Sequence, residues 1–388
     1  MKTTQLIRLF SLPVLIAAGF IAIRCANPES PKSQDSTSFY SQVMSDPALT
    51  EEEKLGKLLF FEKSLSTPEG QDCSFCHDPA LAFTDPNKQL PVSKGAVEGL
   101  YGSRNDMTIS YAAYIPPLHY DEEEEVWVGG LFWDGRSNTL AHQAQQPPLN
   151  PLEMANPDTI TIFNKIKDLP YIDLLLSVYG SEALASPDIA FDYIADAMEA
   201  YQRTPEVSPF TSKYDYYLRG EAELTEQEAR GLDLFVAEDK GNCAACHPHT
   251  PMDDGTPPLF TDFTYDNLGA PVNPANPYYL LPPEHNPDGF NYVDPGLEAT
   301  INDPAERGKF RVPTLRNVEL TSPYLHHGLF HSLWDVVHFY NTRDIGLWPP
   351  PEVPETVNKE ELGDLGLTNQ EMEDIVAFML TLTDGWKK

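Results

Sequence analysis

Positive charge is scarce in this sequence. Lys and Arg number 26 against 59 Asp and Glu, which gives a formal net charge of −33. A surface this acidic repels nucleic acid and anionic lipid, and it suits a basic protein partner. The run Asp121–Glu125 is either a docking patch or a solvated loop. The composition argues against nucleic-acid binding.

Long hydrophobic runs are also missing. The apolar stretch Leu9–Ile23 is interrupted by Pro13 and is too short to span a bilayer comfortably. Basic residues precede it, so residues 1–25 are typical of an export signal. Cys25 closes the stretch as in a bacterial lipoprotein signal, although the residue before it fits that pattern poorly. We expect a periplasmic protein in which Cys25 is either a lipid anchor or a thiol in a discarded peptide.

Cysteine is limited to five residues, and four of them lie in two CxxCH units, "CSFCH" at 73–77 and "CAACH" at 243–247. Cysteines three apart rarely bridge each other outside redox sites, and a redox CxxC needs no following histidine. CxxCH is the attachment pattern of c-type haem, in which two thiols bind the vinyl groups and the histidine binds iron. The sequence therefore predicts two covalent haem groups, held by Cys73, Cys76 and His77 and by Cys243, Cys246 and His247.

A repeat precedes the two CxxCH units. Residues 49–60 and 224–235 match as LTExExxGxxLF. Each copy begins with a capping box, formed by Thr50 with Glu53 and by Thr225 with Glu228, and continues with apolar residues at helical spacing. The matched order of helix and CxxCH favours duplication of one module.

We expect a mainly α fold with two cytochrome c-like haem domains, at 26–210 and 211–388. A third capping box, Thr368 with Glu371, opens a helix that would close the second domain. The 36 prolines, about twice the usual share of roughly 5%, predict long irregular loops and little sheet.

Four further motifs carry a family resemblance. They are FWDGR at 132–136, QPPLNPLEM at 146–154, FTDFTYDNLGAP at 260–271 and FRVPTLRNVELTSPYLHHG at 310–328. With both CxxCH units in order, the chain resembles the bacterial di-haem cytochrome c peroxidases, and most closely their MauG-like branch. The resemblance covers nearly all of the chain after the export signal.

The resemblance implies roles for four residues that the sequence alone would not single out. Glu153 would be the acid-base residue over the first, peroxide-binding haem, where it could move a proton between the peroxide oxygens. Gln143 would hydrogen-bond the peroxide, and Pro147 would cover the same iron without binding it. Trp133 would lie between the haems and relay oxidising equivalents. Taken alone, these are a surface carboxylate, an ordinary glutamine, a loop proline and a core tryptophan.

The resemblance also implies a bound calcium ion, in addition to the two haem groups. In the family it lies between the haems and is held by an asparagine side chain and by carbonyls of a Thr-x-Pro segment. Asn105, Thr321 and Pro323 match these positions. Oxygen ligands suit a hard cation.

Tyr340 matches the position of the second ligand of the second iron, seventeen residues after Pro323. The well-known peroxidases of the family have methionine there, whereas MauG-like proteins have tyrosine, whose anionic oxygen favours oxidised iron. His338 is a rival ligand, but a residue two positions away on a helix points elsewhere. Met372 and Met379 are simpler to explain as core residues of the last helix.

Three departures from the family pattern stand out. His327 occupies a position that is commonly aspartate, which puts the local surroundings in doubt. No histidine matches the one that blocks the first iron in the well-known peroxidases, since His119 is only the nearest in sequence. Gly241 replaces the surface tryptophan that MauG uses to oxidise a protein substrate, so MauG's own reaction should not be transferred.

The sequence therefore predicts an exported di-haem peroxidase that reduces H2O2 with electrons from a small cytochrome c or a cupredoxin. The first alternative is a MauG-like oxidase that modifies a protein side chain through a high-valent di-haem state. A pure electron-transfer cytochrome is the second, and Glu153 argues against it. A haem sensor is the third, and no signalling segment supports it.

Overall fold

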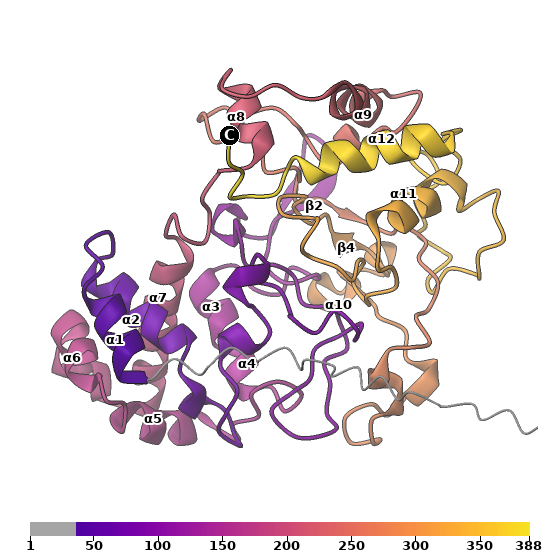
Figure 1. The fold of residues 1–388 in the computed structure, drawn as a ribbon. Helices are drawn as coiled ribbons and strands as arrows, with labels where there is room; N and C mark the ends of the chain where they lie inside the picture. Colours follow the sequence, from indigo (N-terminus) through magenta and orange to yellow (C-terminus); the bar gives the residue numbers. More distant parts are fainter. Residues whose placement is uncertain (1–35) are drawn as a thin grey trace, which may run out of the picture. The chain divides into compact units, whose positions relative to one another are not determined.

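The computed structural model describes residues 36–388, so the predicted export signal and Cys25 lie outside the described residues. Residues Val43–Lys388 form one compact unit (Figure 1). Within the described range, no helix is both long and apolar enough to cross a membrane. The predicted boundary between 210 and 211 stays a prediction.

The fold is mainly α, as predicted, and long irregular segments connect the helices. The helices are α1 Ser36–Met44, α2 Glu51–Phe60, α3 Leu140–Ala144, α4 Gln146–Leu149, α5 Thr159–Lys167, α6 Ile172–Tyr179, α7 Pro187–Gln202, α8 Lys213–Leu218, α9 Glu226–Val236, α10 Glu298–Ile301, α11 Leu333–Thr342 and α12 Asn369–Leu380. The strands are β1 His119–Asp121, β2 Val126–Val128, β3 Tyr265–Asp266 and β4 Phe310–Arg311.

The strands form two short antiparallel pairs. β1 pairs with β2, with His119 opposite Val128, and Glu122–Glu125 of the acidic run make the exposed turn between them. β3 pairs with β4, with Tyr265 opposite Arg311. The second pair joins the segment after the second CxxCH unit to the segment before α11, so it positions both around one cavity.

The predicted capping boxes are all present. The side chains of Thr50, Thr225 and Thr368 each accept from the backbone N–H three residues on, and the glutamate there accepts from the threonine N–H in return. These bonds satisfy backbone donors that a helix start leaves without partners. They fix where α2, α9 and α12 begin.

The repeated glycine lies at a close helix crossing in both copies. A Cβ atom on Gly56 would lie 1.8 Å from the Ala197 carbonyl oxygen on α7, and one on Gly231 would lie 1.9 Å from the Asp374 carbonyl oxygen on α12. A second contact is also the same in both copies. Each Cβ would lie 2.9 Å from the side chain four residues after the one that supplies the carbonyl, which is Tyr201 on α7 and Phe378 on α12. The duplicated unit is therefore a helix pair, α2 with α7 and α9 with α12. From the sequence, the second helix of the pair was predicted only in the second copy.

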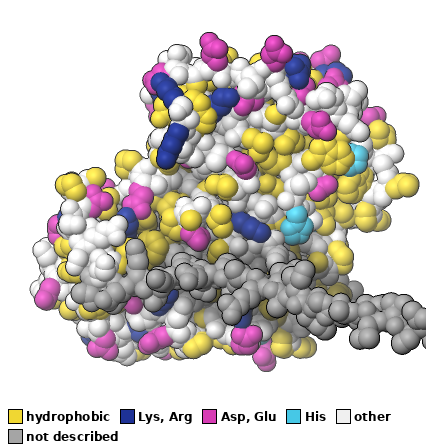
Figure 2. Space-filling model, viewed as in Figure 1, with side chains coloured by type: hydrophobic (Ala, Val, Ile, Leu, Met, Phe, Trp, Pro, Cys, Tyr) yellow, Lys and Arg dark blue, Asp and Glu magenta, His cyan; other side chains and the backbone are white. Residues whose placement is uncertain are grey.

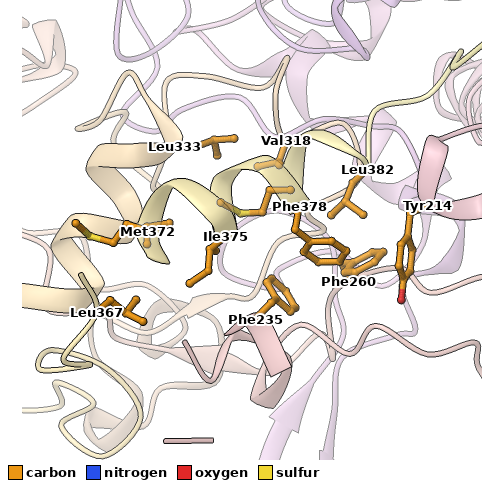
Figure 3. Close-up of a cluster of buried hydrophobic side chains, with 12 residues drawn as sticks. Tyr214, Phe235, Phe260, Val318, Leu333, Leu367, Met372, Ile375, Phe378 and Leu382 are labelled. Atoms are coloured by element: carbon orange, nitrogen blue, oxygen red, sulfur yellow. The ribbon is translucent and has the colours of Figure 1, made fainter. Parts of the chain in front are cut away.

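A core cluster of twelve buried residues surrounds the α9–α12 crossing (Figure 3). Phe235 of α9, Phe378 of α12 and Phe260 from the loop between them meet with ring centroids 5.1 to 6.3 Å apart. All three side chains are buried. A smaller cluster around Phe60, Phe83 and Tyr201 supports the first crossing in the same way.

We expect Gly231→Ala to destabilise the protein, because the new methyl group would overlap the Asp374 carbonyl and separate α9 from α12. Overpacking of this kind costs about 1–3 kcal/mol, more than the roughly 1 kcal/mol of helix propensity that alanine contributes. Guanidinium unfolding of the haem-loaded protein measures the effect. Gly102→Ala is the control, since its Cβ would lie 3.7 Å from the nearest atom. Equal stability of the two variants would contradict the close crossing.

Candidate functional site

The first CxxCH unit opens into a cavity of about 390 Å³. Cys73, Cys76 and His77 line one side of it, and Phe60 and Ile109 contribute apolar walls. Gln143 of α3, Pro147 of α4 and Glu153 line the same cavity, although they follow the CxxCH unit by 66 or more residues. The fold thus brings together every residue predicted to surround the first haem.

Each CxxCH histidine is held by a phenylalanine carbonyl. His77 Nδ1 lies 3.1 Å from the Phe83 carbonyl oxygen, and His247 Nδ1 lies 2.7 Å from that of Phe260. When Nδ1 donates to a carbonyl, Nε2 carries the lone pair that a metal needs. Both phenylalanines have a left-handed backbone, with φ of 57° and 53°.

These two carbonyls were not predicted, although the sequence carries a signal for them. Phe-Thr-Asp occurs at 83–85 and again at 260–262, after the first and the second CxxCH unit. The spacing from the histidine differs, six residues in one copy and thirteen in the other. That difference hides the repeat when only fixed spacings are compared.

Glu153 is positioned by its backbone as well as by its side chain. Its carbonyl accepts from the Ala96 N–H at 2.7 Å, and its carboxylate accepts from the Asn150 amide at 2.7 Å. Gly95 allows the close approach of the two segments, because a Cβ there would lie 2.3 Å from the Leu152 carbonyl oxygen. These contacts hold the carboxylate in the cavity wall.

The surroundings raise the pKa of Glu153 to about 7. Burial is the largest cause, and the negative charge of the half-buried Asp106 adds to it, whereas Arg136 and the Asn150 hydrogen bond act in the opposite direction. A carboxyl group with this pKa can both take up and release a proton near neutral pH.

The second CxxCH unit borders a second cavity, of about 220 Å³. Cys243, Cys246 and His247 line it, and Tyr340 of α11 lines it too. Burial raises the pKa of the Tyr340 phenol well above its ordinary value, so only a nearby cation would favour its anionic form. Burial lowers the pKa of His247 to about 4, which keeps this imidazole neutral and able to bind a metal.

The rival ligands lie elsewhere or have another role. His338 does not line the second cavity; its ring stacks on Trp334 with centroids 4.8 Å apart. Met372 is a core residue, as expected. Met379 is also in the core but lines the cavity, at the position of α12 that corresponds to Gln202 of α7 in the first cavity. Because the same position lines the cavity in both copies, Met379 is better explained as a wall residue than as an iron ligand.

Trp133 lines both cavities, which agrees with the predicted place between the haems. Its indole N–H donates to the Asn105 carbonyl oxygen at 2.8 Å. Asn105, Thr321 and Pro323, the predicted calcium ligands, all line the second cavity. The Asn105 amide donates to the Pro91 carbonyl at 3.1 Å, which leaves its side-chain oxygen as the ligand atom. Calcium binding at this place stays a prediction.

Arg311 supplies a test of whether haem fits these cavities. It is buried, lines both cavities and forms no ion pair among the described residues. Burial without an anion lowers its pKa to about 10. A buried guanidinium without a carboxylate partner is costly, and haem carries carboxylate side chains. The free thiols, the oriented histidines, the apolar walls and this cation all fit the group.

His327, which replaces a common aspartate, forms part of a stacked pair. The His326 and His327 rings lie 4.1 Å apart at 18°, and His327 Nε2 donates to the Pro271 carbonyl at 2.8 Å. Glu352 lies 3.5 Å from His326 Nε2. Because the rings are nearly parallel, their lone pairs do not converge on one point, and the arrangement favours a structural pair over a metal site.

The other two departures also have structural counterparts. His119 lies on β1, exposed, and its Nδ1 is 2.9 Å from the Pro117 carbonyl, so it does not enter the first cavity. Gly241 has no room for a side chain, because a Cβ there would lie 2.5 Å from the Leu234 carbonyl oxygen. A tryptophan at this position would require a different backbone.

Known proteins match both the sequence and the fold. Residues 50–223 match the family model described as di-haem cytochrome c peroxidase. The methylamine utilization protein MauG of Paracoccus denitrificans is 40% identical over 349 residues, covering 85% of this chain and 88% of that protein. The cytochrome-c peroxidase IdrP1 of Pseudomonas sp. strain SCT is 31% identical, with coverage of 87% and 82%.

A solved structure shows the same arrangement of the chain. The diheme peroxidase BthA from Burkholderia thailandensis E264 superposes with a TM-score of 0.77 at 34% sequence identity, covering 88% of this chain and 87% of that one. Its similarity extends through both CxxCH halves, since the coverage spans most of each chain. The fold is therefore shared over nearly the whole described range.

We expect the protein to carry two covalent haem groups, one on each CxxCH unit. Its intact mass should exceed that of the polypeptide by two haems. Because the two cavities are separate, Cys243→Ala/Cys246→Ala should retain the first haem and lose the second. Mass spectrometry with a pyridine haemochrome assay measures the stoichiometry. Haem that acid acetone extracts from the wild type would contradict thioether attachment.

Proposed function

This chain belongs to the di-haem cytochrome c peroxidase family, and we propose that it is an exported peroxidase that reduces H2O2 with electrons from a small redox protein. Members of the family are oxidoreductases with two haem c groups. The observation that carries the proposal is the placement of Glu153 in the cavity of His77, with its pKa raised to about 7.

The first cavity is suited to handle the protons of peroxide. Haem held by Cys73, Cys76 and His77 would supply the electrons that break the O–O bond of the peroxide. Glu153 as carboxylate accepts the proton of one peroxide oxygen and, as carboxylic acid, returns it to the departing oxygen, which leaves as water. Gln143 donates a hydrogen bond that holds the peroxide, and Pro147 offers an apolar wall with no ligand atom.

The second cavity is suited to store and pass on oxidising equivalents. Trp133 borders both cavities and has an oxidisable indole ring. Asn105 also accepts the hydrogen bond from the Trp133 indole. The proposed calcium site of Asn105, Thr321 and Pro323 would therefore connect the segment around Asn105 to the segment before α11. A metal analysis that finds no calcium in the purified protein would contradict this site.

A second candidate function is oxidation of a specific protein side chain. Tyr340 in the second cavity favours it, because an anionic oxygen ligand stabilises oxidised iron, lowers its reduction potential and would let the second site hold an oxidising equivalent. The similarity to MauG at 40% identity also agrees with it. Turnover of H2O2 with a reduced cytochrome, compared with a panel of candidate protein substrates, separates the two functions.

We expect Glu153→Gln to slow the reaction with H2O2 by about a hundred- to ten-thousand-fold, the usual contribution of an acid-base group. In the wild type, the rate should rise with pH through the Glu153 pKa of about 7, because the carboxylate form accepts the proton. The variant should lose this dependence. Stopped-flow mixing with H2O2 measures both effects.

Glu98→Gln is the matched control, since Glu98 is an exposed carboxyl paired with Lys94 on the segment that holds Glu153. Its rate and pH profile should equal those of the wild type. A Glu153→Gln protein that reacts at the wild-type rate would show that another group moves the proton.

Tyr340→Met should raise the reduction potential of the second haem, because a neutral thioether stabilises ferrous iron better than a phenolate does. Tyr340→Phe is the control for loss of the ring oxygen alone. Spectroelectrochemical titration of both haems measures the potentials, and the first haem should keep its value. An unchanged second haem in both variants would mean that Tyr340 does not bind the iron.

A further inference from the structure

The segment that follows α11, residues 343–366, closes the second cavity from outside. Its end returns to α11, where the Gly363 N–H donates to the Tyr340 carbonyl at 2.6 Å and the Asp344 N–H donates to the Gly363 carbonyl at 2.9 Å. Glu361 and Leu362 line the cavity beside Tyr340. We call this segment the 343–366 loop. Its inner side contacts the second haem site, and its outer side is molecular surface.

The outer side of the 343–366 loop combines apolar and acidic groups. Leu347 is fully exposed, at 106%, and Ile345 is 64% exposed. Figure 2 shows hydrophobic side chains gathered on the surface over α11. The exposed charged side chains of the loop are five acids and one base: Asp344, Glu355, Glu360, Glu361, Asp364 and Lys359.

An apolar centre within an acidic rim is suited to transient docking of a basic protein. The apolar side chains contribute contact area, and the rim attracts a cationic partner and sets its orientation. Asp344 is paired with the buried Arg343, at 2.8 Å. The remaining four acids still outnumber Lys359, so the rim has a net negative charge.

Trp348 connects this surface to the helix of Tyr340. It directly follows Leu347 and turns inward, where its indole N–H donates to the Thr342 hydroxyl at 3.0 Å. Its ring packs edge-on to Phe339 with centroids 5.1 Å apart, and Phe339 lies 6.3 Å from the Tyr340 ring. The half-buried indole is thus held in one orientation against α11, and Phe339 is the ring that links it to Tyr340.

We propose that the 343–366 loop is the docking surface for a small basic redox protein, and that Trp348 relays electrons from this donor to the second haem site. This inference rests on the proposed peroxidase function. Reduction of one H2O2 to two waters consumes two protons and two electrons. Each electron comes from one donor molecule, which is thereby oxidised by one electron. Trp348 gives up one electron to the oxidised enzyme and regains one from the donor, so it is unchanged at the end.

The docking surface is tested by removing its charge. Glu355→Gln/Glu360→Gln/Asp364→Asn is compared with Glu122→Gln/Glu123→Gln/Glu124→Gln, which removes three exposed acids from the turn between β1 and β2. The haem-loaded proteins are titrated at low and high salt with a small basic cytochrome c as the probe. We expect the first triple variant to bind the probe about ten-fold more weakly at low salt and to lose most of its salt dependence.

The control triple variant should bind the probe as the wild type does. Equal weakening in the two triple variants would overturn the docking surface, because only net charge would then matter. A small acidic redox protein that binds as tightly as the basic cytochrome would overturn the charge argument.

The relay is tested with Trp348→Phe and, as its matched control, Trp334→Phe on α11, the helix that also carries Tyr340. Stopped-flow mixing first follows the reaction of each enzyme with H2O2 alone, which should be unchanged in both variants. Reduced cytochrome is then added. We expect Trp348→Phe to bind the cytochrome normally but to lose the fast phase of its oxidation, whereas Trp334→Phe keeps that phase. A fast phase that survives in Trp348→Phe, or that disappears in Trp334→Phe alone, would overturn the relay.

The reaction with H2O2 alone tests the proposed function, and the comparison of the triple variants tests the docking surface. A wild type that does not react with H2O2 contradicts the proposed function, and the binding comparison between the triple variants still decides the docking surface. A wild type that reacts with H2O2 and shows no preference between the triple variants contradicts the docking surface alone.

Discussion

The two close helix crossings at Gly56 and Gly231 are the constraint on which the rest of the structure depends. At each crossing the backbones of two helices approach so closely that a single methyl group would overlap a carbonyl oxygen. This approach fixes the direction in which α2 and α9 lead into their CxxCH turns. It also aims the end of α7 and of α12 into the adjacent cavity, where Gln202 and Met379 take corresponding places. The haem sites are therefore positioned by backbone packing.

The same scaffold holds two cavities with different chemistry. Burial raises the pKa of the acidic group in both, but with opposite consequences. The Glu153 carboxyl then titrates near neutral pH, which suits proton transfer to and from a substrate such as peroxide. The Tyr340 phenol stays neutral unless a cation lies nearby, which makes it a selective ligand for an oxidised metal. The duplicated module carries a CxxCH unit in each copy, and the segments packed over the two units place a carboxyl group in one cavity and a phenol in the other.

The wall between the two cavities connects the two sites. Trp133 and Arg311 border both sides, and the Arg311 backbone N–H donates to the Trp133 carbonyl at 2.9 Å. An ion-pair network fixes the FWDGR segment, because Arg104 binds Asp134 at 2.7 Å and Asp294 at 2.6 Å. Asp294 lies 160 residues after Asp134 in the chain, so the network ties the first half to the loops of the second. A rigid wall of this kind keeps the indole at a constant position between the two sites.

The sequence by itself determined the local chemistry of the protein. CxxCH specifies haem attachment because the two thiols and the imidazole must be neighbours in the chain, and the capping boxes specify helix starts because their hydrogen bonds span three residues. The family motifs pointed to Glu153, Trp133 and Tyr340, and the structure places each beside the expected cavity. Only the tertiary structure decided which partners those residues have. The carbonyls of Phe83 and Phe260, the pairing of α2 with α7 and the position of Trp348 against Phe339 depend on contacts at variable sequence separation. No fixed spacing encodes such contacts, because the loops between them differ in length while the packed surfaces must fit.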